Sequence, residues 1–172
     1  MSHIVNLDSD GVQHVIWLQD KSDTCGPACI YMIECNRRLQ SVIGGEERVK
    51  KITAMMPNGY VEGAGTQAIA ALAQTLDTIG ISAHAKFENN MANYLDSARF
   101  PVIVNISWAG GGGHYAVAVK TTRSNDVVFL DPYYALVEKP HSIGGSYRIS
   151  SGVLASGIAA QGRLSGHIVE ID

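Results

Sequence analysis

The order in which two hydrophobic periodicities follow each other constrains the fold of this chain most. Apolar residues recur at helical spacing in stretches between residue 25 and about residue 98, and runs typical of strands follow from residue 101 onwards. Helices followed by strands predict an α+β fold, with an N-terminal helical layer packed on a C-terminal antiparallel sheet. With 172 residues, we expect one domain over 1–172, comprising a helical part at about 19–98 and a sheet part at about 101–172.

Residues that favour helix starts and helix ends define the expected bounds of these segments more closely. Thr66 is a suitable N-cap and Gly80 a suitable end for the third helix, and Pro27 fits the first turn of the first helix. The expected helices cover residues 25–39, 46–56, 66–79 and 89–98. The expected strands cover residues 12–18, 81–87, 102–108, 114–121, 127–130, 147–149 and 167–171.

Composition and charge exclude several classes of protein. Apolar residues make up 46% and charged residues 17%, which argues against disorder, and a net charge of −3 gives no reason to expect nucleic acid as a partner. No apolar run approaches the roughly 18–20 residues of a membrane span, and the N-terminus lacks a secretory signal. We therefore expect a cytoplasmic protein, with export by a signal-independent route left open. The odd number of cysteines, three, favours reduced thiols over a disulfide framework.

Cys25 is the candidate nucleophile, because it stands at the expected start of a helix and directly before Gly26-Pro27. The free N–H groups and partial positive charge of a helix N-terminus stabilise a thiolate, which is the reactive form of cysteine. Cysteine is also one of the most frequently buried residue types, so a cysteine at such a position, taken alone, is more often a core residue than a nucleophile. Cys29 and Cys35 lie inside the helix near its apolar face, where we expect core residues.

His114 and Asp131 are expected to lie side by side. His114 follows four glycines and opens the strand 114–121, and Asp131 ends the strand 127–130. If a hairpin through 122–125 joins these strands, their far ends meet. The carboxylate would then accept the Nδ1 hydrogen and leave Nε2 facing the sulfur. A solvated histidine and an ordinary Asp-Pro turn are the alternatives.

Gln19, six residues before Cys25, is the candidate oxyanion donor. Its amide N–H and the backbone N–H of Cys25 would bind the oxygen that becomes negatively charged during acyl transfer. A solvated loop glutamine is the alternative. No metal or cofactor is expected, because Cys25 and Cys29 lack the further ligands that a zinc site needs.

These motifs resemble those of the papain-like cysteine peptidases. The similarity is greatest to the compact C39-like peptidases of the bacteriocin-processing type, and bacterial effector peptidases with a papain-like fold are similar as well. It covers about a third of the chain, in residues 19–39 and 101–132. The residues that carry it are Gln19, Cys25-Gly26-Pro27-Ala28-Cys29, Pro101-Val102-Ile103-Val104, His114-Tyr115-Ala116-Val117 and Asp131-Pro132.

The resemblance implies roles for four residues. Cys25 would be the nucleophile, His114 the general base and then the general acid, Asp131 the residue that orients the imidazole, and Gln19 the oxyanion donor. No membrane domain or ATPase follows, in contrast to the C39 transporters, so a stand-alone peptidase or a bacterial effector or toxin domain fits better.

Three functions remain open from the sequence. The first is a thiol peptidase that cleaves a protein or peptide substrate through an acyl-enzyme. The second uses the same Cys-His-Asp site for deamidation or acyl transfer, since these reactions share the thioester step. The third is a catalytically silent papain-fold binding module. A toxin role would add a cognate inhibitor or immunity protein as a partner.

Overall fold

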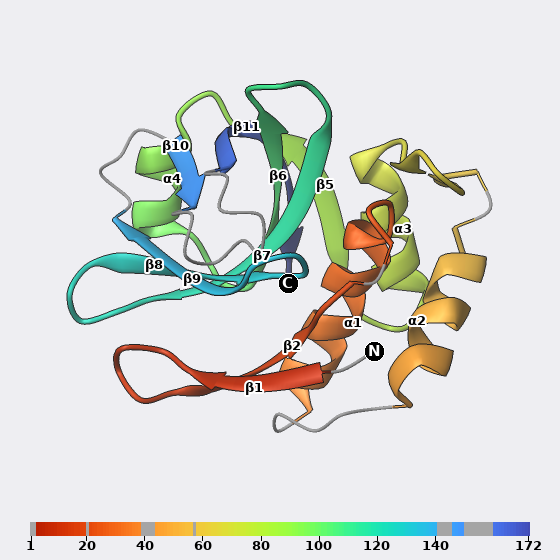
Figure 1. Ribbon diagram of the computed structural model, residues 1–172, viewed down its shortest axis with the longest axis horizontal. Coiled ribbons are helices and arrows are strands. Elements are labelled where there is room, and N and C mark those ends of the chain that lie inside the picture. Colours follow the sequence, from red (N-terminus) through yellow and green to blue (C-terminus); the bar gives the residue numbers. More distant parts are fainter. Residues whose placement is uncertain (1–2, 20, 39–43, 57, 141–145, 150–159) are drawn as a thin grey trace.

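A computed structural model of the chain describes residues 3–19, 21–38, 44–56, 58–140, 146–149 and 160–172. In these residues it contains four α-helices, a seven-stranded antiparallel sheet and two short two-stranded sheets (Figure 1). The predicted α+β class is confirmed, as is the packing of the helix that begins at Cys25 against the antiparallel sheet.

The helices match the predicted segments, but each ends one or two residues earlier than predicted, and the second helix begins one residue earlier. Every residue of the first helix from Cys25 to Cys35 is buried, so this helix runs through the core and does not cover it from outside. Leu39, the last residue of the predicted helix, lies outside the described residues. Gly80, with a φ of +84°, follows the end of the third helix as predicted. The observed helices are α1 (Cys25–Arg37), α2 (Gly45–Ala54), α3 (Ile69–Thr78) and α4 (Met91–Ser97).

The start of α3 differs from the prediction. Thr66 does not cap this helix, because it pairs with Tyr60 in a small hairpin formed by β3 (Tyr60–Val61) and β4 (Gly65–Thr66). Gly65 takes a φ of +80°, a conformation that glycine adopts without steric cost. The hairpin therefore delays the helix by three residues, and the apolar periodicity gave no sign of it.

The large sheet has the strand order β10-β11-β6-β7-β8-β9, and β5 pairs with β11 as well. The sequence predicted six of its seven strands, but it missed β9 and recognised only the last five residues of β11. β9 has weak alternation, because its side chains are mostly half-buried at the edge of the sheet. The strands are β5 (Ala83–Phe87), β6 (Val102–Trp108), β7 (Gly113–Thr121), β8 (Asp126–Asp131), β9 (Ala135–Pro140), β10 (Ser146–Ile149) and β11 (Ala160–Ile171).

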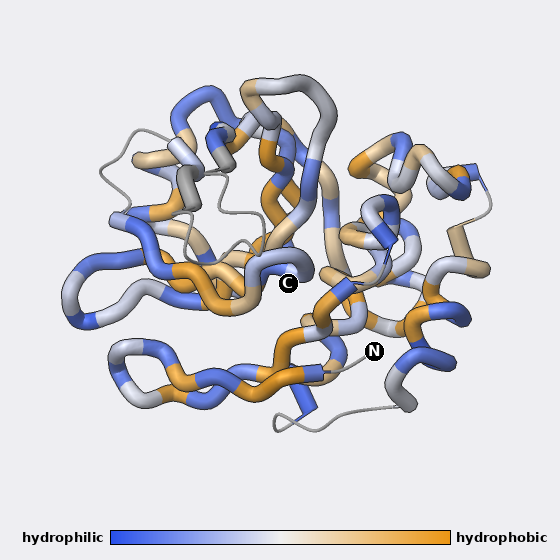
Figure 2. Tube along the Cα trace, viewed as in Figure 1, coloured by the Kyte–Doolittle hydropathy of each residue, from blue (hydrophilic) through white to orange (hydrophobic). Residues whose placement is uncertain are grey.

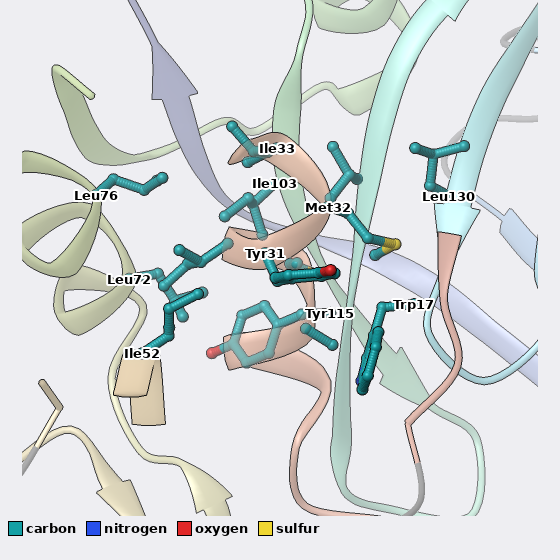
Figure 3. Packing of buried hydrophobic residues seen from close by; sticks show 14 of the residues in the cluster. Trp17, Tyr31, Met32, Ile33, Ile52, Leu72, Leu76, Ile103, Tyr115 and Leu130 are labelled. Atoms are coloured by element: carbon teal, nitrogen blue, oxygen red, sulfur yellow. The ribbon is translucent and has the colours of Figure 1, made fainter. Parts of the chain in front are cut away.

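Two hydrophobic clusters lie on opposite faces of this sheet. Alternation along β6 sends Ile103 to the face that packs against α1, together with Tyr31 and Tyr115 (Figure 3). Val102 and Val104 point to the other face, where they pack with Met91 of α4. Figure 1 shows α1, α2 and α3 gathered on one side and α4 apart from them, and Figure 2 shows hydrophobic stretches along the central strands. The helical layer is therefore made of α1–α3 only, and α4 covers the opposite face.

An N-terminal hairpin leads into the segment that precedes α1. Its strands are β1 (His3–Leu7) and β2 (Gln13–Trp17). The carboxylate of Asp8 closes the turn by accepting from the backbone N–H of Val12 at 2.8 Å. Burial alone would raise the pKa of Asp8, but hydrogen bonds from His14 and Val12 and the charge of Lys120 outweigh it and lower this pKa to about 2. The hairpin is thereby fixed to β7, the strand that carries Lys120.

Candidate active site

Cys25 is the first residue of α1, as predicted, and only 6% of it is exposed. The hydroxyl of Thr24 does not cap the helix, since it donates to the carbonyl of Lys21 at 3.1 Å. The residue after the cysteine has to be glycine, because a Cβ on Gly26 would lie 2.1 Å from the Thr66 hydroxyl oxygen. The sulfur therefore stands at a helix N-terminus without a side-chain cap, where the helix dipole favours a thiolate.

His114 and Asp131 lie side by side, as the hairpin argument predicted. A turn at 122–125 joins β7 and β8, and His114 Nε2 lies 2.8 Å from Asp131 Oδ1. The predicted ring orientation was wrong, because Nε2 and not Nδ1 faces the carboxylate. The other nitrogen, Nδ1, does not bind the carboxylate, and the Cys25 thiol is close enough to the imidazole to help raise its pKa. Strand pairing brings the two residues together, but side-chain torsions decide which nitrogen faces which group.

The environment of His114 favours its charged form. The residue is 5% exposed, and burial alone would lower the pKa of its imidazole. The negative charge of Asp131 and its hydrogen bond outweigh this effect, and the hydrogen bond and charge of Cys25 add to them. Together they raise the pKa of His114 to about 10. An imidazolium next to a thiolate is the resting form that such a site needs for nucleophilic attack.

Asp131 is completely buried and accepts four hydrogen bonds. Oδ1 accepts from the imidazole and from the backbone N–H groups of Tyr133, at 2.8 Å, and Tyr134, at 3.2 Å. Oδ2 accepts from the Tyr147 hydroxyl at 2.6 Å. Burial and the charge of Asp131 raise the pKa of Tyr147 well above its usual value, so the hydroxyl stays protonated and donates. Both carboxylate oxygens thus have hydrogen-bond donors, and no part of Asp131 is exposed to solvent.

Aromatic rings surround His114. The ring of Trp108 stacks on the imidazole, with a centroid distance of 5.6 Å and an interplanar angle of 25°. Tyr133 and Tyr134 present their rings edge-on at 6.4 Å. Sequence reasoning missed Trp108 and Tyr147 as site residues. Only the position of Trp108, two residues before the glycine run 110–113, gave a signal, while Tyr147 lies in a short strand without any motif.

Gln19 lies next to the end of β8. Its backbone N–H donates to the carbonyl of Pro132 at 2.8 Å, which fixes Gln19 beside Asp131. Its side-chain amide donates to the carbonyl of Lys21 at 2.7 Å, while its side-chain oxygen is buried without a hydrogen-bond partner. The backbone of Gln19 is thus tied to the turn after Asp131, and one of its two amide N–H groups binds the carbonyl of Lys21.

The other two cysteines belong to the core, as predicted. Cys29 and Cys35 are completely buried, and burial raises the pKa of the Cys29 thiol well above its usual value, which makes it unreactive. In the part of the chain that the structure describes, no group of three histidine, cysteine, aspartate or glutamate residues is arranged to hold a metal ion. No helix among the described residues has the length and apolar character needed to cross a membrane.

A cavity of about 400 Å³ opens beside the N-terminus of α1. Trp17, Val49 and Tyr60 provide apolar lining, and Thr24, the residue before Cys25, lines the cavity as well. Burial and the hydrogen bond to Asp23 raise the pKa of Tyr60 to about 12, and the charge of Cys25 adds the smallest contribution. The cavity therefore adjoins the candidate nucleophile on the helical side of the site.

Comparison with known proteins finds similarity in solved structures alone. No family model matches the chain. No curated protein matches it either.

Three peptidase domains are similar in structure. A double-glycine motif protease from an AMS/PCAT transporter, solved with its leader peptide, is 14% identical with a TM-score of 0.62 and covers 98% of this chain and 97% of its own. The peptidase domain of Streptococcus ComA, a bifunctional ABC transporter, is 13% identical with a TM-score of 0.62 over 91% of this chain and 96% of its own. The peptidase domain of Streptococcus mutans ComA is 14% identical with a TM-score of 0.52, over 91% of this chain and 98% of its own. The chain therefore has the papain-like fold of C39-type peptidase domains, as the sequence motifs had indicated.

Proposed function

We propose that this protein is a cysteine peptidase in which Cys25 is the nucleophile, His114 the proton carrier and Asp131 the residue that orients it. One observation carries the proposal: a carboxylate holds a buried imidazole through Nε2, and the thiol of a helix-leading cysteine is close enough to the imidazole to help raise its pKa. This arrangement supplies a negatively charged nucleophile, the Cys25 thiolate, and a transferable proton on the neighbouring imidazole of His114.

Acylation would begin with the thiolate of Cys25 attacking the carbonyl carbon of the scissile peptide bond. The S–C bond forms, and the carbonyl oxygen becomes an oxyanion. His114 then donates the Nδ1 proton to the leaving nitrogen, the C–N bond breaks, and an amine departs from a thioester. Asp131 holds Nε2–H throughout, so that Nδ1 keeps facing the reacting atoms.

Deacylation would use the same imidazole in the opposite direction. Neutral Nδ1 accepts a proton from water, the oxygen attacks the thioester, and the thiolate leaves as the acid product forms. Trp108 covers one face of the imidazole and limits the access of bulk water to it.

The oxyanion would be held by the backbone N–H of Cys25 and the free amide N–H of Gln19. Two features support this role. The helix N-terminus has no side-chain cap, and Gln19 is tied by its backbone to Pro132, next to Asp131. A donor held in this way needs little rearrangement when the negative charge develops.

The substrate would be a polypeptide with small residues at the bond that is cleaved. Cys25 and His114 are 6% and 5% exposed, which leaves little room for a bulky side chain at the scissile bond. The neighbouring cavity offers its apolar lining to a side chain further along the substrate. Because one structural neighbour is a double-glycine motif protease, Gly-Gly peptides belong in the first substrate panel.

The first experiment is alkylation with iodoacetamide at pH 6, followed by intact-mass measurement and peptide mapping. We expect rapid and selective modification of Cys25 in the wild-type protein and slow modification in a His114→Gln variant. Cys29→Ser is the matched control, since it removes a cysteine of the same helix and should leave the labelling of Cys25 unchanged. Equal and slow labelling of all three thiols would refute the proposal in favour of a binding module.

The second experiment identifies the reaction. The protein is incubated with a peptide library that includes Gly-Gly sequences, and the products are analysed by mass spectrometry. New chain ends that disappear in Cys25→Ala establish a peptidase, whereas a gain of about one mass unit at glutamine, or transfer to an added amine, would indicate the other two thioester reactions. The effector or toxin role, and an inhibitor or immunity protein as partner, stay predictions from the sequence.

A further inference from the structure

Tyr147 stands out among the residues around the candidate triad. It is 1% exposed, comes from β10 at the far edge of the sheet, and directs its hydroxyl to Oδ2 of Asp131 at 2.6 Å. Oδ1 is already held by two backbone N–H groups and by His114, so the hydroxyl is not needed to aim that oxygen. Its contact is with the oxygen that takes no part in binding the imidazole.

We infer that Tyr147 is a positioning residue that holds the second oxygen of Asp131, disperses the carboxylate charge and limits how strongly Asp131 retains the proton of His114. The catalytic meaning of this inference rests on the proposed function. His114 has to give up its proton during acylation and be neutral during deacylation, so an acceptor that is too basic would slow the cycle. A hydroxyl on the opposite oxygen lowers the basicity of the carboxylate without touching the imidazole.

The surroundings of Asp131 support this role for a single hydroxyl. No part of the carboxylate is exposed, so water does not replace the contribution of Tyr147. Tyr147 packs against Phe129 with ring centroids 5.3 Å apart, which keeps its ring in place. The titratable groups that face Asp131 and its partners are His114 from β7, Tyr133 and Tyr134 from the turn after β8, Tyr147 from β10, and Cys25 and Cys29 from α1.

The test follows the titration of His114 by nitrogen-15 NMR in a Cys25→Ala background. This background removes the thiolate, so the imidazole responds mainly to Asp131. In Tyr147→Phe the pKa of His114 should rise by about one pH unit, because the carboxylate loses a donor and binds the imidazolium proton more tightly. Tyr134→Phe is the matched control, since its hydroxyl does not bond to Asp131, and it should leave the titration unchanged.

A second variant works in the opposite direction and does not remove the hydroxyl. Site-specific 3,5-difluorotyrosine at position 147 makes the hydroxyl a stronger donor and should lower the pKa of His114. It keeps the inference testable if Tyr147→Phe does not fold. If Tyr147 had only a structural role, the variants would lower the melting temperature and leave the pKa of His114 unchanged. An unchanged pKa, or a change opposite to the expected direction, would overturn the inference. The titrations do not depend on catalytic activity. A failure of the proposed function would instead appear in the alkylation of Cys25 in the wild-type protein, so the two proposals are tested separately.

Discussion

Replacing Asp131 by asparagine tests how strongly the charge of Asp131 stabilises the charged form of His114. The change removes the charge and keeps the shape, so the backbone N–H groups of Tyr133 and Tyr134 still find an oxygen. The rise in the pKa of His114 from 6.5 to about 10 corresponds to about 5 kcal/mol in favour of the imidazolium. Asp131 contributes more to this rise than Cys25 does, through its charge and its hydrogen bond.

From this we expect the pKa of His114 to fall by about two pH units in Asp131→Asn. The balance between the thiolate–imidazolium pair and the neutral thiol–imidazole pair then shifts by about a hundredfold towards the neutral pair. Since only the thiolate reacts, alkylation of Cys25 at pH 6 should slow by roughly tenfold or more. The difference in rate should become smaller as the pH rises towards 9.

The assay is iodoacetamide labelling between pH 5 and 9, with the rate at Cys25 obtained by peptide mapping. Asp126→Asn is a matched control, because it makes the same change at the other end of β8, away from His114. Near-ultraviolet circular dichroism checks that both variants are folded. A folded Asp131→Asn variant that is alkylated at the wild-type rate at pH 6 would refute the reasoning.

Three further predictions concern stability, measured by urea unfolding. Because the pKa of Asp8 in the folded protein, about 2, lies below its usual 3.8, its carboxylate stabilises the fold fully above pH 3.8. This contribution of about 2 kcal/mol should be lost as the pH falls from about 4 to 2, and Asp8→Asn should abolish that part of the pH dependence. Gly26→Ala should cost about 1–3 kcal/mol, since the new Cβ would lie 2.1 Å from the Thr66 hydroxyl; an unchanged midpoint would contradict the close approach. Leu72→Ala should cost about 2–5 kcal/mol because Leu72 is completely buried, whereas Leu7→Ala, at a side chain that is 65% exposed, should change stability by less than about 0.5 kcal/mol.

The elements around the site were predictable because their signals are local. The start of α1 at Cys25 depends on a short run with small residues and a proline, and the hairpin between β7 and β8 depends on two apolar runs separated by a turn. The start of α3 was not predictable in this way. Thr66 is a good N-cap by type, but the glycines before it favour the β3–β4 hairpin, and pairing with Tyr60 uses the residue instead.

The sequence by itself determined the class of the fold and the three residues that lie together at its centre. Periodicity and turn residues act over a few positions, and they are sufficient to bring Cys25 to a helix start and His114 beside Asp131. The tertiary structure alone decided that Nε2 faces Asp131, that Trp108 covers the imidazole and that Tyr147 holds the second carboxylate oxygen. These contacts depend on side-chain torsions and packing, which no local pattern encodes.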